Sequence, residues 1–381
     1  MAVKMGKGPG RNKRRIIIIG LIVLLISAAA VFLLRRPFAG KTVSANRSAI
    51  EMGSAASLTL YADTGRLSET ERKQQLSEEA LRIFDIIGDL DQNVLSWRSE
   101  FSETAQFNRS TSTDPLEISP VLAKAISQSL QIAEAGDGAM GITLRPLIEL
   151  WGIESYDGSE PYIPPSRELL TETAAIVGYE HLALDGSRLS KNIPELALDL
   201  GAIGKGYALD LAAEALGNST ISGAVLAVGG SIMTYGSKGD PWQIGIRDPE
   251  GSPADYMAVL SVPGSPKQTA FISTSGGYEK YVEADGIIYE HIIDGRTLQP
   301  AESDLFSVTV VTTVSGLLSD GLSTACYILG REASQPLLDR FGAEAIFVTR
   351  EKTVYLTSGL EGQLSLTRPE YRIKSGNGNM K

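Results

Sequence analysis

The sequence predicts a mixed α+β body behind a single N-terminal membrane helix, and three features lead to this prediction. Hydrophobic residues make up 43% of the 381 residues and charged residues 21%, which is typical of a globular chain. An uncharged run of 19 residues stands near the N-terminus. Helix-like and strand-like patterns then follow one another without an internal repeat and without strict β-α-β alternation.

The uncharged run, residues 16–34, would form a helix of about 28 Å, close to the thickness of a hydrocarbon core. The basic sequence RNKRR precedes it and only Arg35 and Arg36 follow it. This asymmetry predicts a basic cytoplasmic tail (1–15) and a single-pass protein of the cell membrane whose body lies outside the cytoplasm. Three alanines at 28–30 leave a cleaved signal peptide as the alternative, which also places the body outside.

The body begins with a polar tether (35–50) and a strand over 51–63. Ser68 and Glu71 form a capping box, after which apolar residues from Leu76 to Leu90 recur at helical spacing. Later patterns predict helices over 119–136, 205–216 and 315–329, strands at 224–228 and 242–246, two short strands within 343–356, a loop over 155–167 and a loose tail over 368–381.

Charge and composition exclude several classes of function. The first 36 residues hold eight Lys and Arg and no acid, so within a net charge of −10 the rest of the chain carries −18. A body this acidic is a poor binder of phosphate backbones, which argues against nucleic acid. One cysteine and two histidines exclude internal disulfides and cysteine-based metal sites, and nearly exclude multi-histidine sites.

Glycines and a lysine dominate the segment LALDLGAIGKGYALD (196–210). We expect a strand that ends in glycines and a helix with Lys205 in its first turn, an arrangement that can bind an anion. The spacing matches neither a P-loop nor GxGxxG, so a tight turn with a surface lysine remains the alternative. The paired glycines of VGGSIMTYG (228–236) likewise indicate either a ligand close to the backbone or a plain hairpin.

Two further motifs contain candidate catalytic and metal-binding groups. Thr274, Ser275 and Gly276 could form a nest for a phosphate, and His291 lies on an apolar strand, where a structural role is the alternative. Asp320 and Thr324 are four residues apart and so share one helix face, where two hard oxygen ligands would suit Mg²⁺ beside a phosphate. An exposed polar face is the competing interpretation of that pair.

Nine segments in order resemble the ApbE-type FAD:protein FMN transferase family over about residues 48–365. They are MGSAASLTLYA, LSWRSEFSETAQFN, TLRPLIELWG, LDLGAIGKGYALD, VGGSIMTYG, PWQIGIRDP, STSGGYEKY, HIIDGRT and SDGLSTA. The resemblance implies a two-lobed α+β domain related to the T-fold, over residues 51–367. It also implies an enzyme that uses FAD and a divalent metal outside the cytoplasmic membrane. Such enzymes split the FAD pyrophosphate, attach FMN to a threonine or serine of a target protein, which we expect to be a membrane electron-transfer subunit, and release AMP.

The resemblance also assigns residues. It implies metal ligation by the Ala202 carbonyl, Asp320 and Thr324, and it matches His291 to the family's HIID histidine. The implied FAD contacts are Met52, Trp97 (where the family often has tyrosine), Ala139, Met140, Gly141, Asp199 and Lys205. The sequence departs from the family pattern at Gly141 and Gly277, where aspartate is common, and at Gly295 and Leu298, where proline and glycine are usual.

The implied reaction needs a base, because a threonine hydroxyl is a weak nucleophile at neutral pH. His291 is the candidate base because its ordinary pKa is ~6.5, and Asp294 is a second candidate. Two alternatives remain: hydrolysis of FAD to FMN and AMP by the same residues, and a membrane-tethered flavin-binding module that has lost catalysis.

Overall fold

The computed structural model describes residues 41–374. The predicted cytoplasmic tail (1–15), the predicted membrane helix (16–34) and the last seven residues (375–381) lie outside the described residues. Within 41–374, none of the helices combines the length and the apolar character that a membrane crossing requires.

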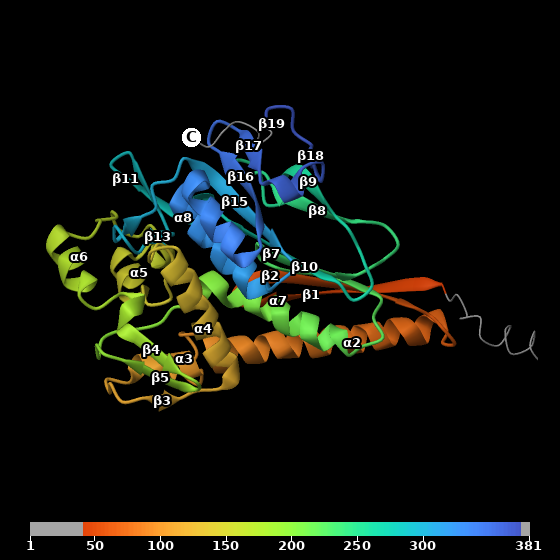
Figure 1. Cartoon of the computed structure of the whole chain (residues 1–381), viewed down its shortest axis with the longest axis horizontal. Coiled ribbons are helices and arrows are strands. Elements are labelled where there is room, and N and C mark those ends of the chain that lie inside the picture. The colour runs from red at the N-terminus through yellow and green to blue at the C-terminus, as the bar shows by residue number, and fades with distance from the viewer. Residues whose placement is uncertain (1–40, 375–381) are drawn as a thin grey trace, which may run out of the picture.

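A nine-stranded sheet forms the centre of the molecule (Figure 1). Its order is β1-β2-β6-β7-β10-β15-β16-β17-β19, and every neighbouring pair is antiparallel except β17 and β19. The strands are β1 (Thr42–Glu51), β2 (Ser54–Asp63), β6 (Gly223–Val228), β7 (Ser231–Gly236), β10 (Thr269–Ser275), β15 (Leu305–Thr312), β16 (Glu344–Thr349), β17 (Thr353–Leu356) and β19 (Arg372–Lys374).

Helices cover one face of this sheet and build the larger core with it. They are α2 (Glu69–Asp89), α4 (Pro120–Ala135), α7 (Gly201–Gly217) and α8 (Gly316–Phe341), and α2 continues into a π-helical turn, η1 (Leu90–Leu95). Leu58 and Leu60 of β2 pack with Ile83 and Ile87 of α2, all without exposed surface. Burial of apolar side chains at ~25 cal/mol per Å² makes this layer the main source of stability.

A second sheet covers the opposite face, where Ile244 and Leu260 pack against Ile272 and Ile346 of the central sheet. Its order is β18-β9-β8, from β8 (Trp242–Arg247), β9 (Tyr256–Val262) and β18 (Leu364–Leu366), with the 3₁₀ turn η5 (Ser358–Leu360) before β18. The central sheet is therefore buried between two layers, and its strand ends are the places where side chains can reach a ligand.

Short elements form a smaller lobe at the left of Figure 1. A third core, around Leu147, Trp151 and Val282, joins α5 to a projecting hairpin made of β11 and β12. The elements are α3 (Glu103–Arg109), β3 (Leu116–Glu117), α5 (Arg145–Trp151), η2 (Ile153–Ser155), α6 (Arg167–Ala174), η3 (Tyr179–His181), β4 (Leu182–Asp185), β5 (Arg188–Lys191), η4 (Gly277–Glu279), β11 (Tyr281–Ala284), β12 (Ile287–Glu290), β13 (Ile293–Asp294) and β14 (Gln299–Pro300).

Most predicted elements are confirmed, because their signals are local. Ser68 and Glu71 form the capping box of α2, and Ser119 caps α4 ahead of Pro120. The helix predicted to stop at Gly330 does break there, at φ 76°, but helical turns resume and α8 ends at Phe341. The loop predicted over 155–167 and the strands at 224–228 and 242–246 are also present.

Three boundaries differ from the prediction. Residues 42–50 are not a tether but most of β1, an edge strand whose polar sequence reflects its exposed positions. The helix predicted from Lys205 begins at Gly201, and the five residues before it form no strand. The predicted loose tail includes β19 and the buried Tyr371, so at least residues 371–374 belong to the fold.

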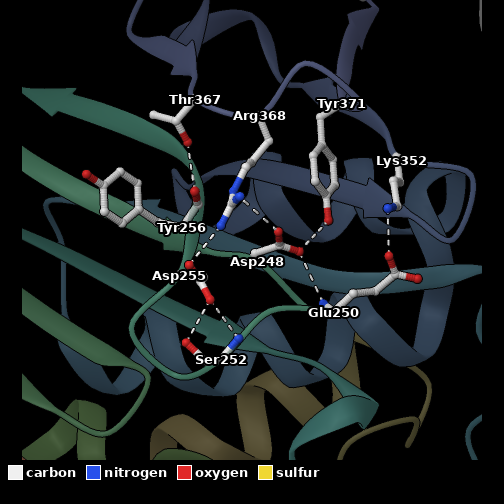
Figure 2. A network of polar contacts seen from close by, with 9 residues as sticks. All are labelled: Asp248, Glu250, Ser252, Asp255, Tyr256, Lys352, Thr367, Arg368 and Tyr371. Atoms are coloured by element: carbon white, nitrogen blue, oxygen red, sulfur yellow. Dashed lines mark hydrogen bonds and ion pairs between the residues drawn. The ribbon is translucent and has the colours of Figure 1, made fainter.

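A polar network holds the C-terminal segment against the loop between β8 and β9 (Figure 2). The buried Asp248 accepts a hydrogen bond from the Tyr371 hydroxyl at 2.7 Å. Arg368 donates to Asp255 at 2.8 Å, and the Thr367 hydroxyl donates to the Tyr256 carbonyl at 2.7 Å. These bonds fix the segment that brings β19 to the edge of the central sheet.

We predict that Tyr371→Phe lowers the free energy of unfolding by about 1.5–3 kcal/mol, the usual range for a hydrogen bond to a charged group. The loss arises because Asp248 stays buried without its closest donor. Thermal unfolding measures the effect, with Tyr256→Phe as the control because that ring is 49% exposed. Equal melting temperatures for the two variants would contradict the prediction.

Candidate active site

Helices α7 and α8 touch backbone to backbone at Gly206 and Gly316. A Cβ added at Gly206 would lie 2.1 Å from the Gly316 carbonyl oxygen, and one added at Gly316 would lie 2.3 Å from the Gly206 carbonyl oxygen. Real Cβ atoms do not approach so closely, so only glycine fits at either position. The crossing brings the second turn of α7 against the first turn of α8.

The crossing places Asp320 of α8 against the backbone of α7. The N–H of Gly206 donates to Asp320 Oδ2 at 2.8 Å, and the Ser231 hydroxyl donates to Oδ1 at 3.0 Å. In a regular helix this N–H would pair with the carbonyl four residues earlier, that of Ala202. The bond to Asp320 competes with that pairing, and the Asp320 carboxylate is only 4% exposed.

Thr324 lies one turn beyond Asp320, and strand β10 faces both. The Ser275 hydroxyl is 3.0 Å from Thr324 Oγ1, and the Ser273 hydroxyl is 2.8 Å from that of Ser319. Asp320 and Thr324 thus lie where α8 faces β10, and Ala202 lies one turn before Gly206 on α7. Within residues 41–374 no cluster of three or more His, Cys, Asp or Glu could hold a metal, so this donor set has one carboxylate and neutral oxygens.

The predicted phosphate nest at 274–276 is wrong for the Thr274 side chain. Successive side chains of a strand point to opposite faces, so Ser275 faces α8 while Thr274 points the other way and bonds to Thr309 at 2.8 Å. Gly276 is needed for close packing, because a Cβ there would lie 2.6 Å from the Phe306 carbonyl oxygen. Of residues 274–276, only Ser275 places a hydroxyl beside α8.

Lys205 lies in the second turn of α7, not the first, because the helix begins at Gly201. Its Nζ is 3.4 Å from the Gly201 carbonyl, and its Cδ lies within 3.3 Å of where a Gly229 Cβ would be. Gly229 and Gly230 form the two-residue turn between β6 and β7, which confirms a hairpin. The lysine therefore runs from the start of α7 toward this turn.

Met52 also reaches the start of α7. It occupies the turn between β1 and β2 at φ 50°, and its Cε would be 3.2 Å from a Cβ at Gly204. The segment before the helix is fixed by Asn108, whose amide donates to the Leu198 carbonyl at 2.9 Å and accepts from the Leu198 N–H at 2.7 Å.

Asp199 caps the same helix end, accepting a hydrogen bond from the Gly201 N–H at 2.8 Å. Burial raises the pKa of Asp199 above its usual value, and the charge of Glu154 adds to this. The Gly201 N–H, Arg145 and Arg98 act in the opposite direction without cancelling the shift. The predicted FAD contact at this position is therefore a carboxyl that protonates more readily than an exposed aspartate.

Trp97 is covered by cations rather than open on all sides. The Arg145 guanidinium lies 3.3 Å from the Trp97 ring centroid and that of Arg98 lies 3.9 Å away. Burial lowers the pKa of Arg145, and the neighbouring carboxylate of Glu149 opposes this. A flavin stacked on Trp97, as the family resemblance implies, would have to share the ring with Arg145 or displace it.

Ala139 and Met140 are core residues, 0% and 3% exposed. The Met140 side chain reaches α8, where its Cε would be 3.0 Å from a Cβ at Gly321. The Ala139 carbonyl accepts a hydrogen bond from the Gly295 N–H at 3.1 Å, which joins the segments around 139 and 294. Any ligand contact from Ala139 must therefore use the backbone.

His291 follows β12 and is held in one orientation. Its Nδ1 is 3.0 Å from the Lys280 carbonyl oxygen. A carbonyl oxygen can only accept, so Nδ1 carries the proton and the lone pair of Nε2 is left to accept one. Burial lowers the pKa of His291, and this outweighs the Lys280 carbonyl, Glu154 and Glu279, which raise it. The ring is therefore neutral at pH 7, as a general base must be.

Asp294, the second candidate base, is engaged elsewhere. Arg296 binds both of its oxygens, Nε to Oδ1 at 2.9 Å and a terminal nitrogen to Oδ2 at 2.7 Å, and its own N–H donates to Oδ1. A carboxylate held by a guanidinium in this way is a poor proton acceptor. The prediction of Asp294 as a base is thus not supported by its contacts.

Two of the four departures from the family pattern have local explanations. A Cβ at Gly277 would lie 1.9 Å from the Glu290 carboxyl carbon, so Glu290 fills the space where aspartate is common. Gly295 donates the N–H that a proline would lack. Leucine at 298 has no structural explanation, because it adopts φ 62°, a conformation that favours the glycine usual in the family. At Gly141 the structure leaves room for a Cβ.

The sequence did not predict the charged residues around His291. Glu154, Lys280 and Arg98 meet there, although Glu154 is 126 residues from Lys280 and 56 from Arg98. No spacing rule marks such a contact, because it arises only when the smaller lobe folds onto the end of the sheet.

Comparisons with known proteins found a matching family, similar sequences and similar structures. The model of the ApbE family matches residues 52–347. The FAD:protein FMN transferase of Escherichia coli K12 is 34% identical over 275 residues, 71% of this chain and 76% of that protein. That of Haemophilus influenzae is 30% identical over 316 residues, 81% and 87%.

Solved structures are similar over a larger share of the chain. The flavin transferase ApbE of Vibrio cholerae has a TM-score of 0.70 at 27% identity, covering 84% of this chain and 99% of that one. The apo flavinyl transferase ApbE of Pseudomonas stutzeri has a TM-score of 0.70 at 29% identity, covering 84% and 97%.

We predict that Gly206→Ala destabilises the protein by at least about 1–3 kcal/mol, the usual cost of overpacking, because α7 and α8 must move apart. Gly217→Ala is the matched control on the same helix, since a Cβ there meets nothing within 4 Å. It should be neutral or stabilise by up to ~1 kcal/mol. Denaturant unfolding measures both, and equal effects would show that the helix crossing tolerates a methyl group.

Proposed function

This chain belongs to the ApbE family and is an FAD:protein FMN transferase, and from that premise we propose the finer reaction. It uses Mg²⁺, joins FMN through a phosphoester to a threonine or serine of an acceptor protein, and releases AMP. The proposal rests on the His291 ring, which is neutral and whose Nε2 can accept a proton. The same chain also holds Asp320 in a cluster of oxygen atoms that could bind a metal ion.

The residues present fit a magnesium ion. Asp320, Thr324 and the Ala202 carbonyl offer a single charge and two neutral oxygens, and Asp320 is fixed by two hydrogen bonds. Mg²⁺ prefers such sparse oxygen sites and completes its shell with water and substrate phosphate. When bound, the ion would neutralise the charge of the pyrophosphate, in a body that is strongly acidic.

The chain's own groups then have distinct tasks. His291 Nε2 takes the proton of the acceptor hydroxyl as its oxygen bonds to the phosphorus of the FMN half. The bond from that phosphorus to the bridging oxygen breaks, and AMP leaves with the electron pair. Lys205, which extends from the start of α7, binds the negative phosphates. Because such a cation acts on ground and transition states alike, its loss should weaken FAD binding as well as transfer.

We also propose that the domain lies outside the cytoplasm, anchored by residues 16–34, with an electron-transfer subunit of the same membrane as acceptor. The basis is the larger positive cluster before residue 16. Protease added to intact spheroplasts should digest the body, and protection of the body until lysis would overturn this topology.

We predict that His291→Ala cuts transfer by about 10²–10⁴-fold, the usual contribution of a general base, while FAD affinity stays nearly unchanged. The assay uses the full-length chain, FAD, Mg²⁺ and membranes from cells that lack this chain, with flavin fluorescence of denatured proteins as the readout. His181→Gln is the control, because that ring bonds to Asn192 on another hairpin. A folded His291→Ala protein with the parent rate would remove His291 from the mechanism.

The acid limb of the parent's pH profile should lie below pH ~6.5, because burial lowers the pKa of His291 and transfer is lost only when the ring becomes protonated.

AMP released from FAD and Mg²⁺ without membranes would identify hydrolysis instead of transfer. Bound FAD without any AMP would identify a binding module.

We predict that Asp320→Ala abolishes the stimulation of transfer by Mg²⁺, because it removes the only charged ligand in the donor set. Activity is measured after EDTA treatment, with and without restored Mg²⁺. Asp339→Ala, an exposed carboxylate on the same helix, is the control. Full Mg²⁺-dependent activity of Asp320→Ala would refute the metal assignment.

A further inference from the structure

Glu154 joins two cations that come from distant parts of the chain. It lies in η2, and its Oε1 is 3.3 Å from Lys280 Nζ while its Oε2 is 3.4 Å from a terminal nitrogen of Arg98. Its side chain is 31% exposed. Burial alone would raise the pKa of Glu154, but Lys280, His291 and Arg98 together lower it, so the group is ionised at neutral pH.

Lys280 links this carboxylate to His291. While its ammonium pairs with Glu154, its carbonyl oxygen accepts from the His291 ring at 3.0 Å and from the His291 backbone N–H at 3.1 Å. One residue therefore fixes the ring at one end and is itself fixed by Glu154 at the other. Lys280 also precedes β11, so this contact attaches the projecting hairpin to the α5 lobe.

Three charged groups influence the His291 ring: Glu154 from η2, Glu279 from η4, and Lys280, which follows η4. The two acids favour the protonated ring and the lysine opposes it. Among the described residues no ion pair within 4 Å joins Glu154 to His291, so Glu154 acts on the ring through Lys280 and through space.

We propose that Glu154 is a positioning residue for the transfer reaction, which orients His291 through Lys280 and stabilises the imidazolium that forms when Nε2 takes the acceptor proton. In a Ser-His-Asp triad one aspartate both orients the histidine and stabilises its charged form. Here the Lys280 carbonyl orients the ring, and the Glu154 carboxylate, which binds the Lys280 ammonium, stabilises the charge. The catalytic part of this inference rests on the proposed function, whereas the effect of the Glu154 charge on the His291 ring does not.

A purely structural role of Glu154 would have different consequences for the titration of His291. If Glu154 only holds Lys280 and Arg98 together, its loss changes stability and rate without changing the pH at which His291 titrates. If Glu154 supports the imidazolium, Glu154→Gln must move that titration to lower pH, because the ring loses a negative neighbour. Lys280→Met must move it to higher pH, because the ring loses a positive one.

The chain's two histidines make this measurement direct. The full-length protein, labelled on histidine and purified in detergent, should give two imidazole signals by NMR, and His291→Ala identifies which belongs to residue 291. The variants are Glu154→Gln and Lys280→Met, with Glu283→Gln as the control because Glu283 is an exposed carboxylate on the same hairpin.

We expect the His291 midpoint to fall in Glu154→Gln, to rise in Lys280→Met and to stay unchanged in Glu283→Gln. Transfer to membrane acceptors at pH 7 should fall about tenfold in Glu154→Gln, less than the 10²–10⁴-fold expected for losing the base itself. FAD binding should remain within about twofold of the parent.

An unchanged His291 midpoint in folded Glu154→Gln overturns the inference. If that variant does not fold, the direction of the shift in Lys280→Met decides in its place. Parent protein that labels no membrane protein would refute the proposed function instead, and parent protein that labels normally while the Glu154→Gln midpoint stays unchanged refutes only the role of Glu154.

Discussion

The contact between Gly206 of α7 and Gly316 of α8 is the constraint on which the rest of the site depends. It lets two helix backbones approach more closely than any side chain would permit. That approach brings the Gly206 N–H to Asp320, and the neighbouring Lys205 extends from the start of α7 toward the turn between β6 and β7. The oxygen cluster around Asp320 and the position of Lys205, which we propose binds phosphate, thus both depend on this one contact.

The base comes from a different part of the fold. His291 lies at the foot of the β11–β12 hairpin, which packs on α5 through the third core. The hairpin is also attached to α8, because the Tyr327 hydroxyl donates to Glu290 of β12 at 2.6 Å. The site is therefore assembled from two supports. The larger one fixes the proposed metal and phosphate ligands through close backbone packing, and the smaller one fixes the His291 ring through Lys280. This division explains why the oxygen cluster is nearly buried, whereas the groups around His291 are charged and only partly buried.

Much of the fold could be predicted from the sequence where the signal is local. The cap at Ser68, the proline after Ser119 and the glycine break at Gly330 each act within one or two helical turns. The spacing of Asp320 and Thr324 placed both on one helix face. Thr274 shows the limit of such reasoning: its motif was noticed, but the alternation of side chains in β10 decides that its hydroxyl points away from α8. β1 was missed because an edge strand shows little hydrophobic alternation, and Glu154 because its partners are far away in sequence.

If this site transfers FMN to a protein outside the cytoplasm, as we propose, the transferred FMN must be found on a membrane protein. The most direct measurement is mass spectrometry of membrane proteins from cells with and without this chain, searching for peptides that carry an added FMN. The account predicts at least one threonine- or serine-linked FMN peptide that is present only when the chain is present. Identical sets of flavin-bearing peptides in the two kinds of cell would contradict it.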